Sequence, residues 1–102
     1  MTSNPLADLI EATQLFVSRI ACGDTYREAE LSSGITAEVA RTCGHLRRGE
    51  MEHIYYGLGD RGVDVAIAIA GTAVGATAPT LSIAVREAAL AWCGQHAQLH
   101  SC

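Results

Sequence analysis

Basic side chains between positions 25 and 49 are spaced in a way that could contact the phosphates of DNA. The segment TYREAELSSGITAEVARTCGHLRRG is typical of a helix-turn-helix, with a short helix, a small-residue turn at Ser33-Gly34 and a second helix over residues 36–48. Positions i, i+4 and i+7 share one face of a helix, so three of its basic side chains would point the same way. The following segment MEHIYYGLGDRG could form the wing of such a domain. The basic residues of the second helix are Arg41, His45, Arg47 and Arg48.

The charge of the chain argues against DNA as the main partner. The chain of 102 residues has a formal net charge of −4, and all seven basic residues are arginine. Such a balance gives no long-range attraction to nucleic acid or to an anionic membrane. Carboxylates also surround the basic helix, so a solvated face with Glu–Arg pairs explains the same pattern. DNA binding is therefore the alternative function.

Sulfur and imidazole groups near the end of the chain have the spacing of metal ligands. Cys93, His96 and His100 lie at i, i+3 and i+7 of a terminal helix, and Cys102 follows closely. Thiolates and imidazoles at this spacing can hold a transition metal. The motif CGQHAQLHSC contains no Asp or Glu to orient the imidazoles. We therefore predict incidental histidines on a surface helix and no metal or other cofactor.

Motifs of catalytic sites are absent from the sequence. The chain has no P-loop, no G-x-S-x-G motif and no G-x-G-x-x-G fingerprint after a strand. Cys43 and His45 do not form a dyad, because residues two apart on a helix point about 200° apart. The sequence therefore predicts a protein that is not an enzyme.

Length and composition predict a single small domain over residues 1–102. Hydrophobic residues make up 49% of the chain but aromatic residues only 5%. Small aliphatic side chains must then fill most of the core, which favours closely packed helices. The four cysteines are far apart, and the opening MTSNPLADLIEA has no export signal. These features indicate a cytoplasmic protein with reduced thiols.

The segment GVDVAIAIAGTAVGATAP, residues 62–79, decides the predicted fold class. Residues 65–85 carry no charge over 21 positions, enough to cross a bilayer, but the many Ala, Gly and Thr residues make the transfer energy marginal. A wing-like hairpin over residues 52–69 is the stronger rival, since VDVAIAI alternates large and small side chains. Alanine favours helix over strand. We therefore predict a central Ala/Gly-rich helix, in which Gly71 and Gly75 allow close packing, and leave the hairpin open as the alternative.

Helix signals divide the rest of the chain, and the whole reads as an all-α bundle of four to five helices. The expected boundaries are Asn4 and Pro5 to Gly23, a capping box at Thr25 and Glu28 to Gly34, a Thr36 cap to about residue 58 with a break near Gly49 as the alternative, and Thr80 to Leu99. The last helix is expected to bury Leu81, Val85, Ala88, Trp92 and Leu99.

The run LFVSRIACGDTYREAELSS resembles short helical proteins of pseudomonads in which a Phe-Val segment, a glycine and a short helix precede a second helix. The matching residues are Leu15, Phe16, Gly23, Glu28, Ala29 and Ser33. Among these proteins are antiactivators of the QslA type, which bind a LuxR-type quorum-sensing regulator and block its dimerisation. The resemblance implies a protein-binding regulator of transcription and transfers no functional residue.

Recognition of another protein through an apolar helical surface is the function that these features predict. Two adjacent tyrosines cannot both face the core from one helix, so one of them is expected to be an interface anchor. The chain has few aromatic residues with which to build a core large enough for a stable monomer. We therefore also predict a homodimer, through the 62–78 helix or the terminal helix. The expected partner-binding residues are Tyr55, Tyr56, Ile54, Leu58 and Phe16.

Overall fold

A three-stranded antiparallel sheet packs against four helices in the computed structural model, which describes residues 5–96. The elements follow in the order α1 (Pro5–Ala21), α2 (Tyr26–Ser33), α3 (Ile35–Arg48), β1 (Ile54–Gly59), β2 (Gly62–Ile69), β3 (Thr72–Ala78) and α4 (Leu81–His96). The predicted all-α helical bundle is therefore wrong, because three segments that were expected to be helical are strands.

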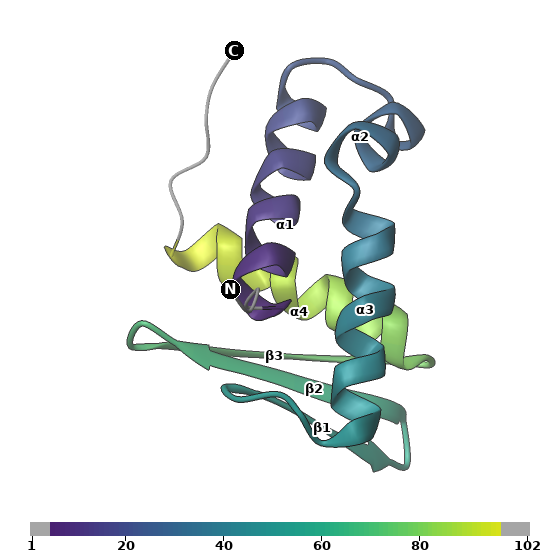
Figure 1. Cartoon of the computed structure of the whole chain (residues 1–102), viewed down its shortest axis with the longest axis vertical. Helices are drawn as coiled ribbons and strands as arrows, with labels where there is room; N and C mark the ends of the chain where they lie inside the picture. Colours follow the sequence, from purple (N-terminus) through teal and green to yellow (C-terminus); the bar gives the residue numbers. More distant parts are fainter. Residues whose placement is uncertain (1–4, 97–102) are drawn as a thin grey trace.

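Sheet and helices form two layers. Figure 1 shows the helices on one side of the sheet. α4 lies along the strands, and α1 and α3 run across the direction of the strands. The core lies between the layers, and no described helix covers the opposite face of the sheet. The strands follow the order β1-β2-β3, so β1 and β3 are the edge strands.

Local signals set the first helices as the sequence predicts. Pro5 begins α1, while Asn4 lies outside the described residues. The capping box is confirmed, since the main-chain N–H of Thr25 donates to the Glu28 carboxylate at 2.9 Å and that of Glu28 donates to the Thr25 hydroxyl at 3.2 Å. Gly34 takes a left-handed conformation (φ 70°) and ends α2.

The predicted helix over residues 36–58 is wrong in its second half. α3 stops at Arg48 because Gly49 is left-handed (φ 74°). The N–H of Gly49 donates to the carbonyl oxygens of His45 and Leu46 in the last turn of the helix. The break near Gly49, which the sequence left as an alternative, is therefore confirmed. Thr36 does not cap the helix; its hydroxyl donates to the Glu30 carboxylate at 3.2 Å.

The predicted central helix over residues 62–78 is a hairpin of β2 and β3. Val63, Val65 and Ile67 are buried against the helices, whereas the residues between them face outward. Alanine's helix preference over valine or isoleucine is under about 0.7 kcal/mol per residue, but burying one such side chain is worth about 1.5–3 kcal/mol. Burial therefore decides the conformation. No helical dimer seam exists here, since Gly71 lies in the turn and Gly75 in β3.

Two tight turns connect the strands. Ala70 and Gly71 form the turn between β2 and β3, and both have positive φ angles, 51° and 77°, as in the turns that match the twist of a hairpin. At the other turn, Gly62 has φ 126° and packs so closely that an added Cβ would lie 2.5 Å from the carbonyl oxygen of Ala78. A side chain at position 62 would therefore push the start of β2 away from the end of β3.

An alanine-rich central helix does exist, but it is α4. Ala84, Ala88 and Ala89 are fully buried, because α4 contacts the sheet on one side and α1 and α3 on the other. The predicted burial of Leu81, Val85, Ala88 and Trp92 is confirmed, while Leu99 lies outside the described residues. Among residues 5–96, none of the helices combines the length and apolar character that a membrane span requires.

Candidate protein-binding surface

The face of the sheet that points away from the helices is built from small side chains. The register pairs Tyr55 of β1 with Ala66 of β2, and Ala66 with Gly75 of β3, so these residues share one face. We call this face the outer sheet surface; it is formed by Tyr55, Gly57, Asp64, Ala66, Ala68, Ala73, Gly75 and Thr77. Such a flat floor allows the main chain of a partner to approach closely.

A hollow of about 460 Å³ lies on the outer sheet surface. Alanine and glycine form most of its floor, and Tyr55, which is 60% exposed, stands beside it. Asp64 contributes the carboxylate that lines the hollow, and this carboxylate accepts a hydrogen bond of 2.5 Å from the Thr77 hydroxyl. The hollow therefore offers an apolar floor with one polar pair, which suits an apolar side chain of a partner.

β1 adds two exposed apolar side chains on the other face. Tyr56 and Leu58 point towards the helix layer, opposite Val65 and Val63 of β2, yet they are 42% and 84% exposed. The helices do not cover this end of β1, because α4 packs on β2 and β3 and α3 makes few contacts with β1. Uncovered large apolar groups on an edge strand are typical of a contact surface.

The predicted partner-binding residues divide between surface and core. Tyr55, Tyr56 and Leu58 are exposed, as that prediction requires. Ile54 is buried in the main core, and Phe16 packs edge-to-face on Tyr26 with ring centroids 5.0 Å apart. These two residues support the fold and do not belong to the exposed surface.

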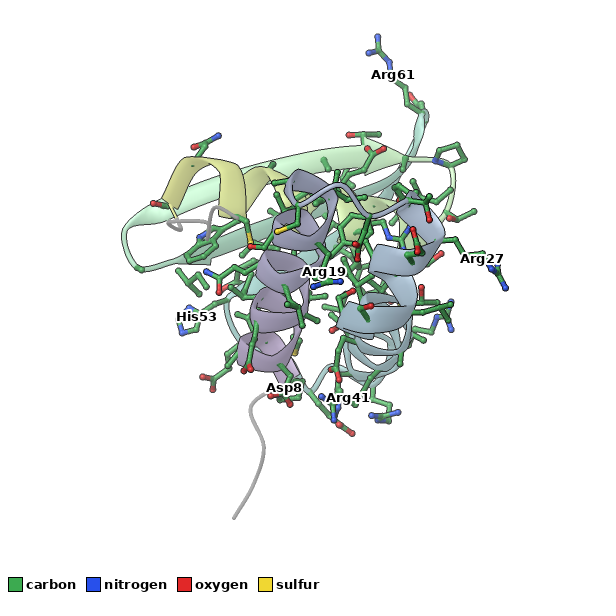
Figure 2. The ribbon with its side chains drawn as sticks, turned by 90° about the horizontal axis from the view of Figure 1, so that it is seen from above. Asp8, Arg19, Arg27, Arg41, His53 and Arg61 are labelled. Carbon is green, nitrogen blue, oxygen red and sulfur yellow. The ribbon has the colours of Figure 1, made fainter. Side chains whose placement is uncertain are left out.

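The basic residues of α3 are mostly paired with carboxylates. The Arg41 guanidinium donates to Asp8 at 2.6 Å and also to Glu38, and Figure 2 shows the Asp8 and Arg41 side chains directed towards one another. Arg48 and His45 contact the carboxylate of Glu50 at 2.7 and 2.9 Å. These contacts balance the charge that a DNA phosphate would need, and of the four predicted residues only Arg47 has no such pair among the described residues.

Electrostatic coupling around Glu50 follows from those pairs. Hydrogen bonds from Arg48, and then from His45, lower the pKa of the Glu50 carboxyl. The carboxylate therefore stays ionised and holds both basic groups at the end of α3.

The two helices α2 and α3 are joined by the single residue Gly34, and a hairpin follows them, so the backbone retains the order that the DNA-binding alternative predicts.

No family model, curated protein or solved structure matches the chain significantly. The residues and their arrangement are therefore the basis for proposing a function.

Buried cysteines are poor candidates for chemistry. Burial raises the pKa of the Cys93 thiol to about 11, and it also raises the pKa of Cys43. No group of three metal-ligating side chains exists within the described part of the chain. The side chain of His96 and the residues His100 and Cys102 lie outside that part. Cys43 and Cys93 are free, but Cys22 is disulfide-bonded, so the prediction of four reduced thiols is wrong for Cys22.

Sequence reasoning missed most of the outer sheet surface. Ala66, Gly75 and Thr77 were expected on a helix at the centre of a bundle or in a dimer interface, whereas they lie on the exposed face of the sheet. The signal was present in the alternation of VDVAIAI, because a half-buried strand places every second residue on its open face.

Proposed function

We propose that the chain is a non-enzymatic regulatory protein that binds another protein through the outer sheet surface. The observation that supports this proposal is an uncovered sheet face with a hollow of about 460 Å³ and an exposed tyrosine beside it. Antiparallel sheets often expose one face, but that face is usually polar. Here the exposed face is mainly alanine and glycine, which is a reason to expect a covering partner.

The hollow fits an anchor side chain better than a small metabolite. Its carboxylate is engaged by Thr77, and Asp64 and the two tyrosines are the titratable residues among those that line it. Binding hot spots are aromatic or aliphatic groups seated in such hollows and surrounded by contacts that exclude water. An amphipathic helix or loop with one large apolar side chain would place that side chain over Ala66 and Gly75.

The identity of the partner is proposed from the resemblance alone. A LuxR-type transcription regulator is the partner that the similarity of residues 15–33 to small antiactivators implies. Mixing the purified chain with such a regulator and measuring complex formation by light scattering tests this part of the proposal. The result bears on the identity of the partner and is independent of which surface binds.

A charge placed on the outer sheet surface tests the surface itself. Ala66→Glu puts a carboxylate on the exposed floor of the hollow, and Ala37→Glu makes the same change at an exposed position in the first turn of α3. We expect affinity capture from host lysate to recover a partner with wild type and Ala37→Glu, and to lose it with Ala66→Glu. Circular dichroism first establishes that both variants are folded.

Retention of every captured partner by Ala66→Glu would contradict the proposed surface. Capture of no partner by wild type would contradict the proposed function. A partner lost equally in both variants would point to a general effect of charge and would also contradict the role of the outer sheet surface.

DNA binding stays the alternative, because α2, α3 and the following hairpin have the order of a winged DNA-binding domain. The pairing of Arg41 and Arg48 with carboxylates lowers the affinity that we expect. We predict no binding tighter than the non-specific range of roughly 10⁻⁴ to 10⁻⁶ M at physiological salt. A nanomolar complex with a specific duplex that Arg47→Glu abolishes would favour the alternative.

The cytoplasm remains the proposed location, and the disulfide of Cys22 weighs against it. Fractionation of host cells, with an antibody to the chain, tests the location directly.

A further inference from the structure

The open edge of β1 presents main-chain hydrogen-bonding groups to its surroundings. The His53 carbonyl accepts from the N–H of Ala68 at 2.9 Å, so position 53 belongs to a hydrogen-bonded pair with β2. Such pairs occur at every second residue of an antiparallel ladder. Positions 55, 57 and 59 therefore bond to β2, and the N–H and C=O groups of Ile54, Tyr56 and Leu58 point to the open edge.

This edge lacks the features that normally prevent strands from pairing. The sequence of β1, IYYGLG, contains no charged residue and no proline. Natural proteins protect open edges with charges, proline or covering elements. The other edge strand, β3, also carries no charge, but it projects only small groups, whereas β1 projects Tyr56 and Leu58. A strand partner is therefore expected at β1.

We infer that β1 pairs with β1 of a second copy of the chain, antiparallel, around a two-fold axis at Tyr56. The sequence of β1 is complementary to itself in this register. Leu58 of one copy lies opposite Ile54 of the other, so its exposed side chain reaches the edge of the second copy's core. Tyr55 lies opposite Gly57, and an aromatic ring covers the bare glycine on the outer face.

Charged residues flank the paired strands at both ends. Arg61, at the tip of the β1–β2 turn, extends away from the body of the molecule (Figure 2). Antiparallel pairing brings this tip to the entry of the second copy's β1, where Glu52 is exposed. In this register Asp60 lies opposite Glu52 of the second copy, and Arg61 follows one position later. Arg61 is then the cation next to both carboxylates and offsets their repulsion.

The exposed side chains of β1 supply about half of the area of a standard interface. At roughly 150–250 Å² for a large side chain, the exposed parts of Tyr55, Tyr56 and Leu58 amount to about 400 Å² per copy, against about 800 Å² per partner in a standard interface. The paired main chains and the charged ends supply further area. Pairing joins the two three-stranded sheets and makes their outer sheet surfaces continuous. The inference does not depend on the proposed function, since dimerisation is measured without any other partner.

Mass measurement of the purified chain tests the dimer. We expect sedimentation equilibrium to show a monomer–dimer equilibrium for wild type. Leu58→Lys places a charge on the open edge, and we expect it to raise the dissociation constant by about tenfold or more. The matched control is Leu31→Lys on α2, at an apolar position that is 74% exposed; it should leave the dissociation constant unchanged. Wild type that stays monomeric at high micromolar concentration, or equal effects of the two lysines, would overturn the inference.

Cysteine cross-linking tests the register. At the proposed axis the two copies of residue 56 are a hydrogen-bonded pair with Cα atoms about 5.5 Å apart, within the range of a disulfide. The two copies of residue 58 would be more than about 13 Å apart. Tyr56→Cys should therefore form a covalent dimer under oxidation, above the background of wild type, and Leu58→Cys should not. Equal cross-linking at both positions, or at neither, would overturn the proposed register.

Discussion

Arg86 joins three helices through one side chain. Its guanidinium donates to the Tyr26 hydroxyl at 2.7 Å, to the Glu30 carboxylate at 3.0 Å and to the Thr36 hydroxyl at 3.2 Å. It also lies 5.8 Å from the ring centroid of Phe16 and 5.6 Å from that of Tyr26. α4 is thereby fixed to α2 and α3 at their outer side. A partly buried arginine that satisfies several acceptors stabilises more than an exposed ion pair does.

Replacing Arg86 by methionine should therefore weaken the fold. Methionine keeps much of the aliphatic stem but removes the hydrogen bonds, so we expect the free energy of unfolding to fall by about 1–3 kcal/mol. Urea unfolding at pH 7 measures the change. Arg27→Met is the matched control, because Arg27 extends into solvent from α2 (Figure 2); it should change stability by less than about 0.5 kcal/mol. Equal costs for the two variants would show that the Arg86 contacts contribute nothing.

The capping box of α2 should give Glu28 an acidic titration. The main-chain N–H of Thr25, and then its hydroxyl, lower the pKa of the Glu28 carboxyl below its usual 4.5. A carboxyl with a lowered pKa in the folded state stabilises fully above its unfolded pKa, and this contribution disappears as pH falls through the folded pKa. The stability advantage of wild type over Glu28→Gln should therefore shrink below pH 4.5. Side-chain NMR titration gives the midpoint directly, and a value at or above 4.5 would contradict the expectation.

At the scale of the element, the β2–β3 turn contains a residue that is poorly suited to its conformation. Ala70 has a positive φ of 51°, and its side chain is exposed, so no packing compensates for the conformational cost. A left-handed conformation costs a residue other than glycine roughly 1 kcal/mol, and asparagine tolerates it best. The hairpin is therefore held by the burial of its strands rather than by its turn.

Ala70→Asn should consequently stabilise the protein. The expected gain is about 0.5–1 kcal/mol, because asparagine followed by Gly71 is a favoured pair in two-residue hairpin turns. Thermal and urea unfolding measure the gain. Gly71→Ala, at the second residue of the same turn, should lower the free energy of unfolding by a similar amount, since it puts a second Cβ at a positive φ of 77°. A loss of stability in Ala70→Asn would contradict the turn geometry.

At the scale of the whole molecule, α4 holds the two layers together. Ala84, Ala88 and Ala89 let the sheet and the other helices approach α4 on its two sides, and all three are fully buried. Close packing around such small residues leaves no room for a larger side chain.

Ala88→Leu should therefore destabilise the fold by about 1–3 kcal/mol through overpacking. Ala37→Leu, at an exposed position of α3, adds the same atoms in solvent and should be close to neutral. Urea unfolding of both variants gives the comparison. If Ala88→Leu were as stable as Ala37→Leu, α4 would not be the close-packed centre of the molecule.

Local signals determined the first helices of this protein from the sequence alone. Pro5, the Thr25–Glu28 capping box and Gly34 act within a few residues of chain, so their effect can be predicted without knowledge of the fold. The buried face of the last helix was also predictable, because its apolar residues recur at helical spacing. The exposed Tyr55, Tyr56 and Leu58 were predicted as a contact surface on a helix, and they lie on a strand instead.

Only the tertiary structure decided the state of residues 54–78. Alanine-rich segments have a weak local preference, and here helix and hairpin were both consistent with the pattern. The presence of α4 decided between them, because α4 offers one apolar face against which Val63, Val65 and Ile67 can be buried together. A helix over the same residues would leave apolar groups on all its sides. The candidate surface followed from that choice, since the strand conformation alone brings Tyr55, Ala66 and Gly75 to one face.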